Sequence, residues 1–160
     1  MQLLTKTITD RNIWNASLAK MPTSHVLQTW EWGEFKAETT GWKPHRLAFF
    51  NHGEAVGMAQ VLTRQEGPLR VMYVPKGPVL DYTDEDVRQS VLAELKRYAE
   101  EHGAIFIKID PDVVIGVGEP GAPDAKTLPL GYTIQQEWEK AGLRFSAEQV
   151  QFRNSVVIDL

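Results

Sequence analysis

Lys76 lies between two prolines in the segment Tyr73-Val-Pro-Lys-Gly-Pro-Val-Leu80. A lysine ammonium can offer a point charge to a phosphate or a carboxylate. The proline rings at 75 and 78 restrict the backbone on both sides of the lysine, so it is held more rigidly than an ordinary surface lysine. From the residues alone, Lys76 is a candidate ligand contact, with a solvated side chain as the alternative.

The same segment is poorly suited to bind a pyrophosphate. Such a loop needs a run of free backbone N–H groups, usually glycine-rich and at the start of a helix. Pro75 and Pro78 have no N–H, and only Gly77 is free to adopt a left-handed conformation. The segment therefore indicates a site that uses no nucleotide-type cofactor.

Two carboxylates follow an apolar segment as Asp110-Pro-Asp112. The end of a buried strand is the favoured side for function in α/β sheets. An aspartate before a proline is also an ordinary way to start a turn. Ligand contact by Asp110 and a purely structural turn both remain open.

Aromatic residues cluster in Gln28-Thr-Trp-Glu-Trp-Gly-Glu-Phe-Lys36. Trp30 or Trp32, together with Phe35, can form the buried face of a short helix. Lys36 projects one turn beyond Trp32, where it is either solvated or available to a phosphate or carboxylate.

Familiar catalytic groups are missing from the sequence. There is no cysteine, and the four histidines, His25, His45, His52 and His102, lack metal-ligand spacing. Neither a Gly-x-Ser-x-Gly elbow nor a P-loop is present. We therefore name no catalytic residue and expect no metal and no cofactor.

The composition describes an acidic globular protein. The chain has 160 residues, 42% of them hydrophobic, and a net charge of −4. These values predict one domain and argue against a basic nucleic-acid footprint. No apolar run approaches the ~20 residues that span a bilayer, and the N-terminus lacks a signal-peptide core, so we expect a cytoplasmic protein.

Periodicity and turn residues predict an alternating order of strands and helices. The strands are expected at residues 3–8, 43–50, 55–64, 70–74, 104–109 and within 149–160, and the helices at 10–20, 31–39, 84–102 and 133–140. Residues 111–130 are rich in glycine and proline and are expected to form a long surface loop. Asp10 is the expected cap of the helix over 10–20, whose inward side includes Ile13, and Thr83 is the expected cap of the helix over 84–102. Gly41 is expected to stop the helix over 31–39, residues 51–54 to form a turn, and the strand at 104–109 to be mostly buried.

This order predicts an α/β (α+β) fold with a mixed sheet flanked by helices. The strands at 70–74 and 104–109 are joined through a helix, so they should be parallel. The layout resembles the GNAT acyltransferases, in which the sheet opens between two parallel strands. The GNAT cofactor signature, (Arg/Gln)-x-x-Gly-x-(Gly/Ala), is absent after residue 74, and the glycine-rich stretch 116–121 follows the wrong strand.

An ordered set of motifs is similar to the N-terminal half of the Fem-type (FemABX) peptidoglycan peptidyltransferases. The motifs are Gln28-x-x-x-Trp32-Gly33-x-x-Lys36, Tyr73-Val-Pro-Lys-Gly-Pro-Val79, Phe106-Ile-Lys-Ile-Asp-Pro111 and Val156-Val-Ile-Asp-Leu160. The resemblance extends over nearly the whole chain. It implies two GNAT-like domains in the full protein, of which residues 1–160 form the first.

The resemblance also implies a reaction and its partners. Fem-type enzymes transfer an amino acid from aminoacyl-tRNA to the stem peptide of a peptidoglycan precursor, a UDP-linked or lipid-linked muramyl peptide, and use no acetyl-CoA. By motif position, Lys36 matches a family lysine that contacts the precursor. Glu38 occupies a neighbouring position where an asparagine would suit a precursor hydrogen bond better.

The expected precursor-binding residues are Trp32, Lys36, Glu38, Tyr73, Lys76, Gly77 and Asp110. The tRNA is expected to bind a second domain. Two rival functions remain from the sequence. One is a stand-alone N-acetyltransferase that uses acetyl-CoA, and the other is a non-catalytic GNAT-like interaction domain.

Overall fold

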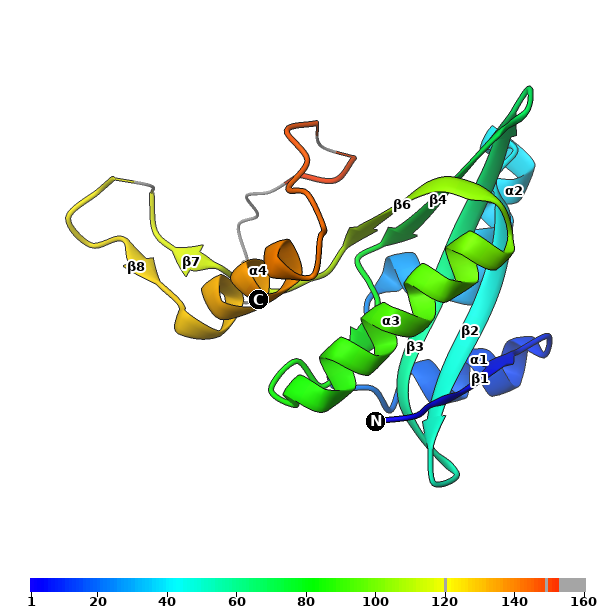
Figure 1. The fold of residues 1–160 in the computed structure, drawn as a ribbon, viewed down its shortest axis with the longest axis horizontal. Helices are drawn as coiled ribbons and strands as arrows, with labels where there is room; N and C mark the ends of the chain where they lie inside the picture. The colour runs from blue at the N-terminus through cyan, green and yellow to red at the C-terminus, as the bar shows by residue number, and fades with distance from the viewer. Residues whose placement is uncertain (120, 149, 153–160) are drawn as a thin grey trace. The chain divides into compact units, whose positions relative to one another are not determined.

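A six-stranded mixed sheet forms the centre of residues 1–112 (Figure 1). Its strands are β1 (Leu4–Thr7), β2 (Lys43–Asn51), β3 (Glu54–Glu66), β4 (Leu69–Pro75), β5 (Val79–Leu80) and β6 (Ala104–Asp110). The spatial order is β1-β2-β3-β4-β6, and β5 pairs with β3. The β4–β6 pair is parallel and the other pairs are antiparallel, which confirms the predicted mixed sheet.

This computed structural model describes residues 1–119, 121–148 and 150–152. The chain divides into two units, residues 1–112 and residues 113–160, and each is described by itself. No helix in the described part of the chain is both long and apolar enough to cross a membrane.

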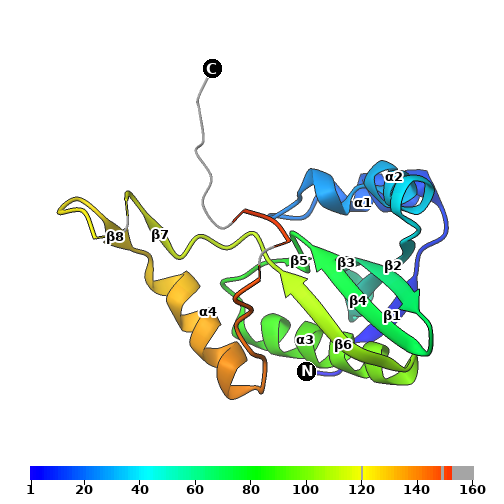
Figure 2. The same ribbon diagram turned by 90° about the horizontal axis from the view of Figure 1, so that it is seen from above.

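Helices cover both faces of the sheet in the first unit. Figure 2 shows α1 (Arg11–Leu18) and α2 (Trp30–Thr40) on one face and α3 (Glu85–Glu101) on the other. The short 3₁₀ helix η1 (Val26–Gln28) leads into α2. Trp14 and Leu18 of α1 pack with Met58 of β3 in a buried cluster.

Helices α1 and α3 each begin after an aspartate whose side chain accepts a hydrogen bond from a backbone N–H group in the first turn. Asp10 accepts from the Ile13 N–H at 2.8 Å, as the sequence predicted for α1. The predicted cap of α3 was wrong by one residue, because Asp84 accepts from the Val87 N–H at 3.0 Å. Thr83 instead donates its hydroxyl to Asp81 at 2.7 Å.

Several apolar side chains predicted to be buried are exposed. Ile13 is 58% exposed and Phe35 is 49% exposed, so the expected inward faces of α1 and α2 were partly wrong. Strand β6 was expected to be mostly buried, yet Ile105 and Phe106 are 56% and 53% exposed. Within the first unit β6 pairs with β4 along one side only, which makes it an edge strand.

Strand β5 was not predicted, because its two residues are too few for a periodic signal. Val79 and Leu80 are nonetheless fully buried, and Leu80 lies opposite Gly57 of β3. The pairing brings the chain back onto the sheet at Val79, three residues after Lys76. The lysine therefore lies in a short connection between two strands.

The second unit contains more regular structure than the expected loop. Strands β7 (Gly116–Val117) and β8 (Lys126–Thr127) form an antiparallel pair, so the prediction of a structureless loop over 111–130 was partly wrong. Helix α4 (Pro129–Lys140) starts four residues before the predicted Thr133, with proline in its first turn. The strand expected to end at Leu160 lies outside the described residues.

Candidate functional site

Polar side chains gather at the carboxyl ends of the parallel strands β4 and β6. Pro75, the last residue of β4, lies opposite Asp110, the last residue of β6. The Tyr73 hydroxyl donates a hydrogen bond to Asp110 Oδ2 at 3.1 Å. Lys76 Nζ donates to Asp112 Oδ1 at 3.1 Å. We call Tyr73, Lys76, Asp110 and Asp112 the carboxyl-end cluster.

Lys76 has an unusual backbone within this cluster. Its φ is +47°, in the left-handed region that non-glycine residues rarely adopt. The side chain is 16% exposed, so it is largely enclosed but still reachable. An ammonium has three donor hydrogens, and the Asp112 contact uses one of them. Lys76 can therefore stay paired with Asp112 and still donate to an anionic or carbonyl oxygen.

The backbone carbonyls on either side of Lys76 are hydrogen-bonded by buried side chains. Gln28 Nε2 donates to the Pro75 carbonyl oxygen at 2.6 Å, and Gln28 is fully buried. The Tyr82 hydroxyl donates to the Pro78 carbonyl oxygen, and Tyr82 is 4% exposed. Burial raises the pKa of Tyr82, so its hydroxyl stays protonated and remains a donor. The connection that carries Lys76 is thus held at both ends.

Gly77 lies against the side chain of Gln28. A Cβ added at Gly77 would lie 2.8 Å from Gln28 Nε2 and 3.0 Å from Val74 Cγ1. Atoms that close must shift, and Gln28 is fixed at both ends of its amide. This packing explains why glycine stands here. Its expected contact with a ligand stays a prediction.

A hydrogen-bond network extends from the buried Gln28 through the buried Gln60 and Arg46 to Glu34, whose side chain is 47% exposed. Gln28 Oε1 accepts from the Gln60 N–H at 2.6 Å, and Gln60 Oε1 accepts from Arg46 Nε at 3.0 Å. Arg46 Nη2 donates to Glu34 Oε1 at 2.8 Å. Sequence reasoning missed Arg46 and Gln60, which face each other across β2 and β3. Their only signal was a polar residue at an inward position of an apolar strand.

A second group of predicted residues lies on α2. Lys36 Nζ is 5.9 Å from the centroid of the Trp32 ring, and that ring lies 5.5 Å from the Phe35 ring. Trp32 is half-buried, and its indole Nε1 is a buried atom with no hydrogen-bond partner among the described residues. Glu38 is exposed on the same helix. Helix α2 thus presents an aromatic surface of Trp32 and Phe35 with Lys36 beside it, and the exposed Glu38 lies three residues after Phe35.

Trp42 links helix α2 to the carboxyl-end cluster. It follows Gly41, which ends α2 with a left-handed φ of +72°. The Trp42 ring lies 6.5 Å from the Tyr73 ring. Tyr73 pairs with Leu62 of β3, and alternation along β3 places Leu62 on the same face as Gln60, the face under α2. Tyr73 and α2 therefore share one face of the sheet.

His25 lies in the electrostatic field of the carboxyl-end cluster. Burial lowers the pKa of His25; the charges of Asp112 and Asp110 oppose this shift, and that of Lys76 adds to it. His25 Nδ1 accepts a hydrogen bond from the Leu27 N–H at 3.1 Å. In the neutral ring the hydrogen must then be on Nε2, which makes that nitrogen a donor. Sequence reasoning did not place His25 near the site.

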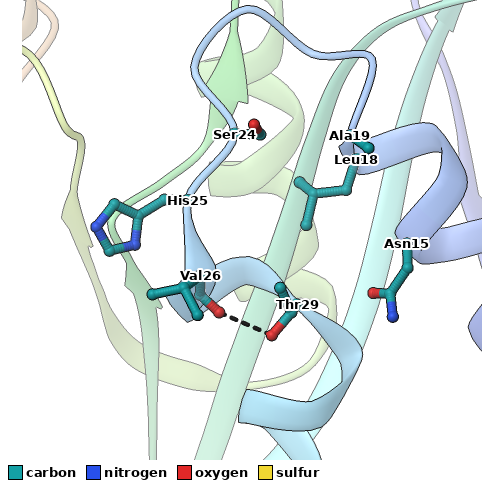
Figure 3. A pocket seen from close by; sticks show the side chains of 7 residues that line it. All are labelled: Asn15, Leu18, Ala19, Ser24, His25, Val26 and Thr29. Carbon is teal, nitrogen blue, oxygen red and sulfur yellow. Dashed lines mark hydrogen bonds between the residues drawn. The ribbon is translucent and has the colours of Figure 1, made fainter. Parts of the chain in front are cut away.

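The pocket drawn in Figure 3 lies beside these groups, between the end of α1 and η1. It has a volume of about 230 Å³ and is lined by Asn15, Leu18, Ala19, Ser24, His25, Val26 and Thr29. Its polar side chains already serve the fold. Asn15 Oδ1 accepts from the Trp30 N–H at 3.0 Å, and the Thr29 hydroxyl donates to the Val26 carbonyl at 2.8 Å. We therefore do not place the ligand site in this pocket.

Metal binding has no support in the described part of the chain. No group of three or more histidine, aspartate or glutamate side chains there is arranged to hold a metal ion. The two groups that could contact a ligand are the carboxyl-end cluster and the aromatic surface of α2. Together they offer two lysines, the exposed ring of Phe35, the half-buried ring of Trp32 and carboxylates, a combination suited to a large, polar, partly anionic ligand.

Comparison with known proteins identifies relatives. Residues 11–160 match the FemAB family. The chain is 33% identical over 116 residues to the lipid II:glycine glycyltransferase of Staphylococcus aureus. That match covers 71% of this chain and 27% of the relative. The chain thus spans about a quarter of the length of the curated relatives it matches.

Solved structures show the same fold. The crystal structure of FemX has a TM-score of 0.66 and 26% identity, covering 86% of this chain and 31% of FemX. An aminoglycoside acetyltransferase from an uncultured soil metagenomic sample has a TM-score of 0.54 and 15% identity, covering 97% of this chain and all of that one. The second likeness concerns the fold alone, and confirms the expected GNAT-like sheet. By the family match and the similarity to its members, this chain belongs to the FemAB family.

Proposed function

We propose that this chain binds the peptidoglycan precursor for an aminoacyltransferase that builds cell-wall interpeptide bridges. The observation that carries the proposal is Lys76, held by Gln28 and Tyr82 at the carboxyl end of β4 in a FemAB-family fold. The relative from Staphylococcus aureus is described as a lipid II:glycine glycyltransferase. A muramyl peptide with its diphosphate would find lysines and aromatic rings on this face of the sheet.

Each residue expected at the site has a proposed part. Lys36 and Lys76 donate to phosphate or carbonyl oxygens of the precursor, and Trp32 provides apolar contact area beside Lys36. Tyr73 is only 7% exposed, so it offers the precursor little area. Asp110 orients the Tyr73 hydroxyl through their hydrogen bond of 3.1 Å. Glu38 is exposed on α2 beside this group, whereas Gly77 is buried and its part is to leave room for Gln28 next to Lys76.

The proposed aminoacyl transfer requires this chain to bind and position the precursor, and it requires no nucleophilic side chain. The precursor amine attacks the ester carbonyl of the aminoacyl donor, an amide bond forms, and the ester C–O bond breaks. The proton lost by the amine goes to the departing hydroxyl oxygen. Positioning of the two reactants and stabilisation of the oxyanion can supply most of the acceleration.

The donor and the domain arrangement are also part of the proposal. We propose aminoacyl-tRNA as the donor, bound by a second GNAT-like domain, with residues 1–160 as the first. Such an enzyme acts in the cytoplasm, where aminoacyl-tRNA is made. Pro75 and Pro78 lack N–H groups and their carbonyls are hydrogen-bonded within the chain, so this connection is unsuited to hold the diphosphate of acetyl-CoA.

Isothermal titration of the full-length protein tests the proposal. One arm uses a UDP-linked muramyl pentapeptide and the other uses lipid II in detergent micelles, so the two precursor forms are distinguished. Lys36→Ala and Lys76→Ala should each raise the Kd by roughly ten-fold, because each removes a charge-assisted contact. Lys20→Ala is the matched control, since Lys20 is exposed just after α1. Wild-type protein that bound acetyl-CoA and neither precursor would contradict the proposal.

A further inference from the structure

The side-chain amide of Gln28 links strand β3 to residues 75–78, the short segment that carries Lys76, through hydrogen bonds. It is fully buried, and both of its polar atoms are engaged: Nε2 with the Pro75 carbonyl at 2.6 Å and Oε1 with the Gln60 N–H at 2.6 Å. Its own backbone carbonyl accepts from the Trp14 indole N–H at 2.8 Å. Gln28 is thereby fixed between α1, β3 and β4.

Fixing the Pro75 carbonyl has a direct consequence for the next residue. That carbonyl belongs to the peptide unit that links Pro75 to Lys76, so its orientation helps to set the backbone of Lys76. Lys76 adopts a φ of +47°, which a non-glycine residue keeps only when its surroundings hold it there. The absence of a side chain at Gly77 lets the amide of Gln28 approach this closely.

A second buried donor acts from the other side. The Tyr82 hydroxyl donates to the Pro78 carbonyl, and the Tyr82 backbone carbonyl accepts from Arg88 Nη1 at 2.6 Å. Arg88 is 3% exposed. The four residues 75–78 are therefore held at their first and last carbonyls by side chains that do not themselves reach solvent.

We propose that Gln28 and Tyr82 are positioning residues that set the direction of the Lys76 ammonium for precursor binding. The inference rests on the proposed function, because it concerns the same site. Gln28 and Tyr82 act through Lys76 and do not touch the precursor. Loss of the Gln28–Pro75 or the Tyr82–Pro78 hydrogen bond leaves the charge of Lys76 unchanged but allows the backbone of residues 75–78 to move.

Lipid II titrated into the full-length protein provides the test. Gln28→Glu keeps the shape of the side chain but replaces the N–H donor with an oxygen facing the Pro75 carbonyl. Tyr82→Phe removes only the hydroxyl and stays available if Gln28→Glu fails to fold. Each should raise the Kd for lipid II by about three- to ten-fold, the loss expected for one hydrogen bond.

A double-mutant cycle with Lys76→Ala separates positioning from general destabilisation. If Gln28 and Tyr82 act through the lysine, then neither substitution changes the Kd once Lys76→Ala is present. Gln60→Glu is the matched control, because it makes the same change at a fully buried site of the same network that does not touch residues 75–78. It should lower the melting temperature yet leave the Kd within about two-fold.

The possible outcomes each decide a different question. Effects of Gln28→Glu and Tyr82→Phe that persist undiminished in the Lys76→Ala background would overturn the positioning role, as would wild-type affinity in both single variants. Wild-type affinity in Lys76→Ala itself would instead remove Lys76 from the proposed site and the positioning role with it. A wild-type protein that binds neither lipid II nor the UDP-linked muramyl pentapeptide would overturn the proposed function, whereas one that binds only the UDP-linked form would keep it and carry the same cycle over to that ligand.

Discussion

The guanidinium of Arg46 stacks on the indole ring of Trp30, with its carbon Cζ 3.4 Å from the ring centroid. Arg46 is 5% exposed, and burial lowers its pKa while the hydrogen bond and charge of Glu34 oppose that shift. The stacking and the hydrogen bonds to Gln60 and Glu34 compensate a charge that would otherwise be costly to bury. This pair joins helix α2 to strand β2.

Replacement of Arg46 by methionine should lower the free energy of unfolding by about 2–3 kcal/mol. The change leaves buried Gln60 Oε1 without its donor, whereas Glu34 is half-exposed and can be solvated. Urea denaturation measures the difference. Glu34→Gln is the control and should cost less than about 1 kcal/mol, because its partner keeps a hydrogen-bond acceptor. Equal stabilities for the two variants would contradict this account.

Replacement of Gly33 by alanine should destabilise the protein, although alanine is the better helix former by about 1 kcal/mol. A Cβ at Gly33 would lie 2.6 Å from Arg46 Nη2 and closer still to Gln60 Oε1, and both groups are buried. We expect a net loss of about 1–3 kcal/mol in urea denaturation. Glu38→Ala, on the exposed face of the same helix, should stay within about 0.5 kcal/mol. A stabilised Gly33→Ala variant would show that the interior accommodates the methyl group.

The stability of the fold should fall as the pH drops below 6.5, in part because of His45. Burial lowers the pKa of His45 from 6.5, and the charges of His102, Arg70, Lys43 and Arg46 lower it further. The unfolded chain therefore binds a proton before the folded chain does. This contribution to stability is present above pH 6.5 and is lost as the pH falls from there through the folded-state pKa.

Thermal unfolding across roughly pH 5 to 8, the range in which a histidine side chain ordinarily changes its charge, checks the contribution of His45. His45→Gln should show a shallower fall in melting temperature below pH 6.5 than the wild type. His52→Asn is the control, because His52 is exposed in a turn with a φ of +49° that asparagine tolerates. A slope unchanged by His45→Gln would assign the pH dependence to other groups.

Replacement of Glu38 by asparagine should tighten precursor binding. Under the proposed function, the exposed carboxylate on α2 should repel the diphosphate of a muramyl peptide, and asparagine would remove the charge while keeping hydrogen-bonding atoms. At low salt the Kd should fall by about two- to five-fold, as expected for charges several ångströms apart in water. The gain should shrink at high ionic strength because of screening. Weaker binding in Glu38→Asn would mean that the carboxylate itself contacts the ligand.

The amino-acid sequence by itself determined the order of the elements longer than three residues in the first unit, and much of the sheet. Local signals sufficed there: Asp10 caps α1, Gly41 ends α2, and the turn at residues 51–54 joins β2 to β3. The helical connection between β4 and β6 required them to be parallel. These features depend on interactions among residues close in sequence or on chain connectivity, both of which a pattern can express.

Only the tertiary structure decided which polar residues act together. Gln28 and Pro75 are 47 positions apart, and Tyr73 and Asp110 are 37 apart. No periodic pattern in the sequence predicts that a buried amide will hydrogen-bond a particular carbonyl, because the packing of the helices on the sheet determines which groups come into contact. The same reason explains the exposed Phe106, since burial depends on neighbours that the local sequence does not contain, whereas β5 was missed because its two residues carry no periodic signal.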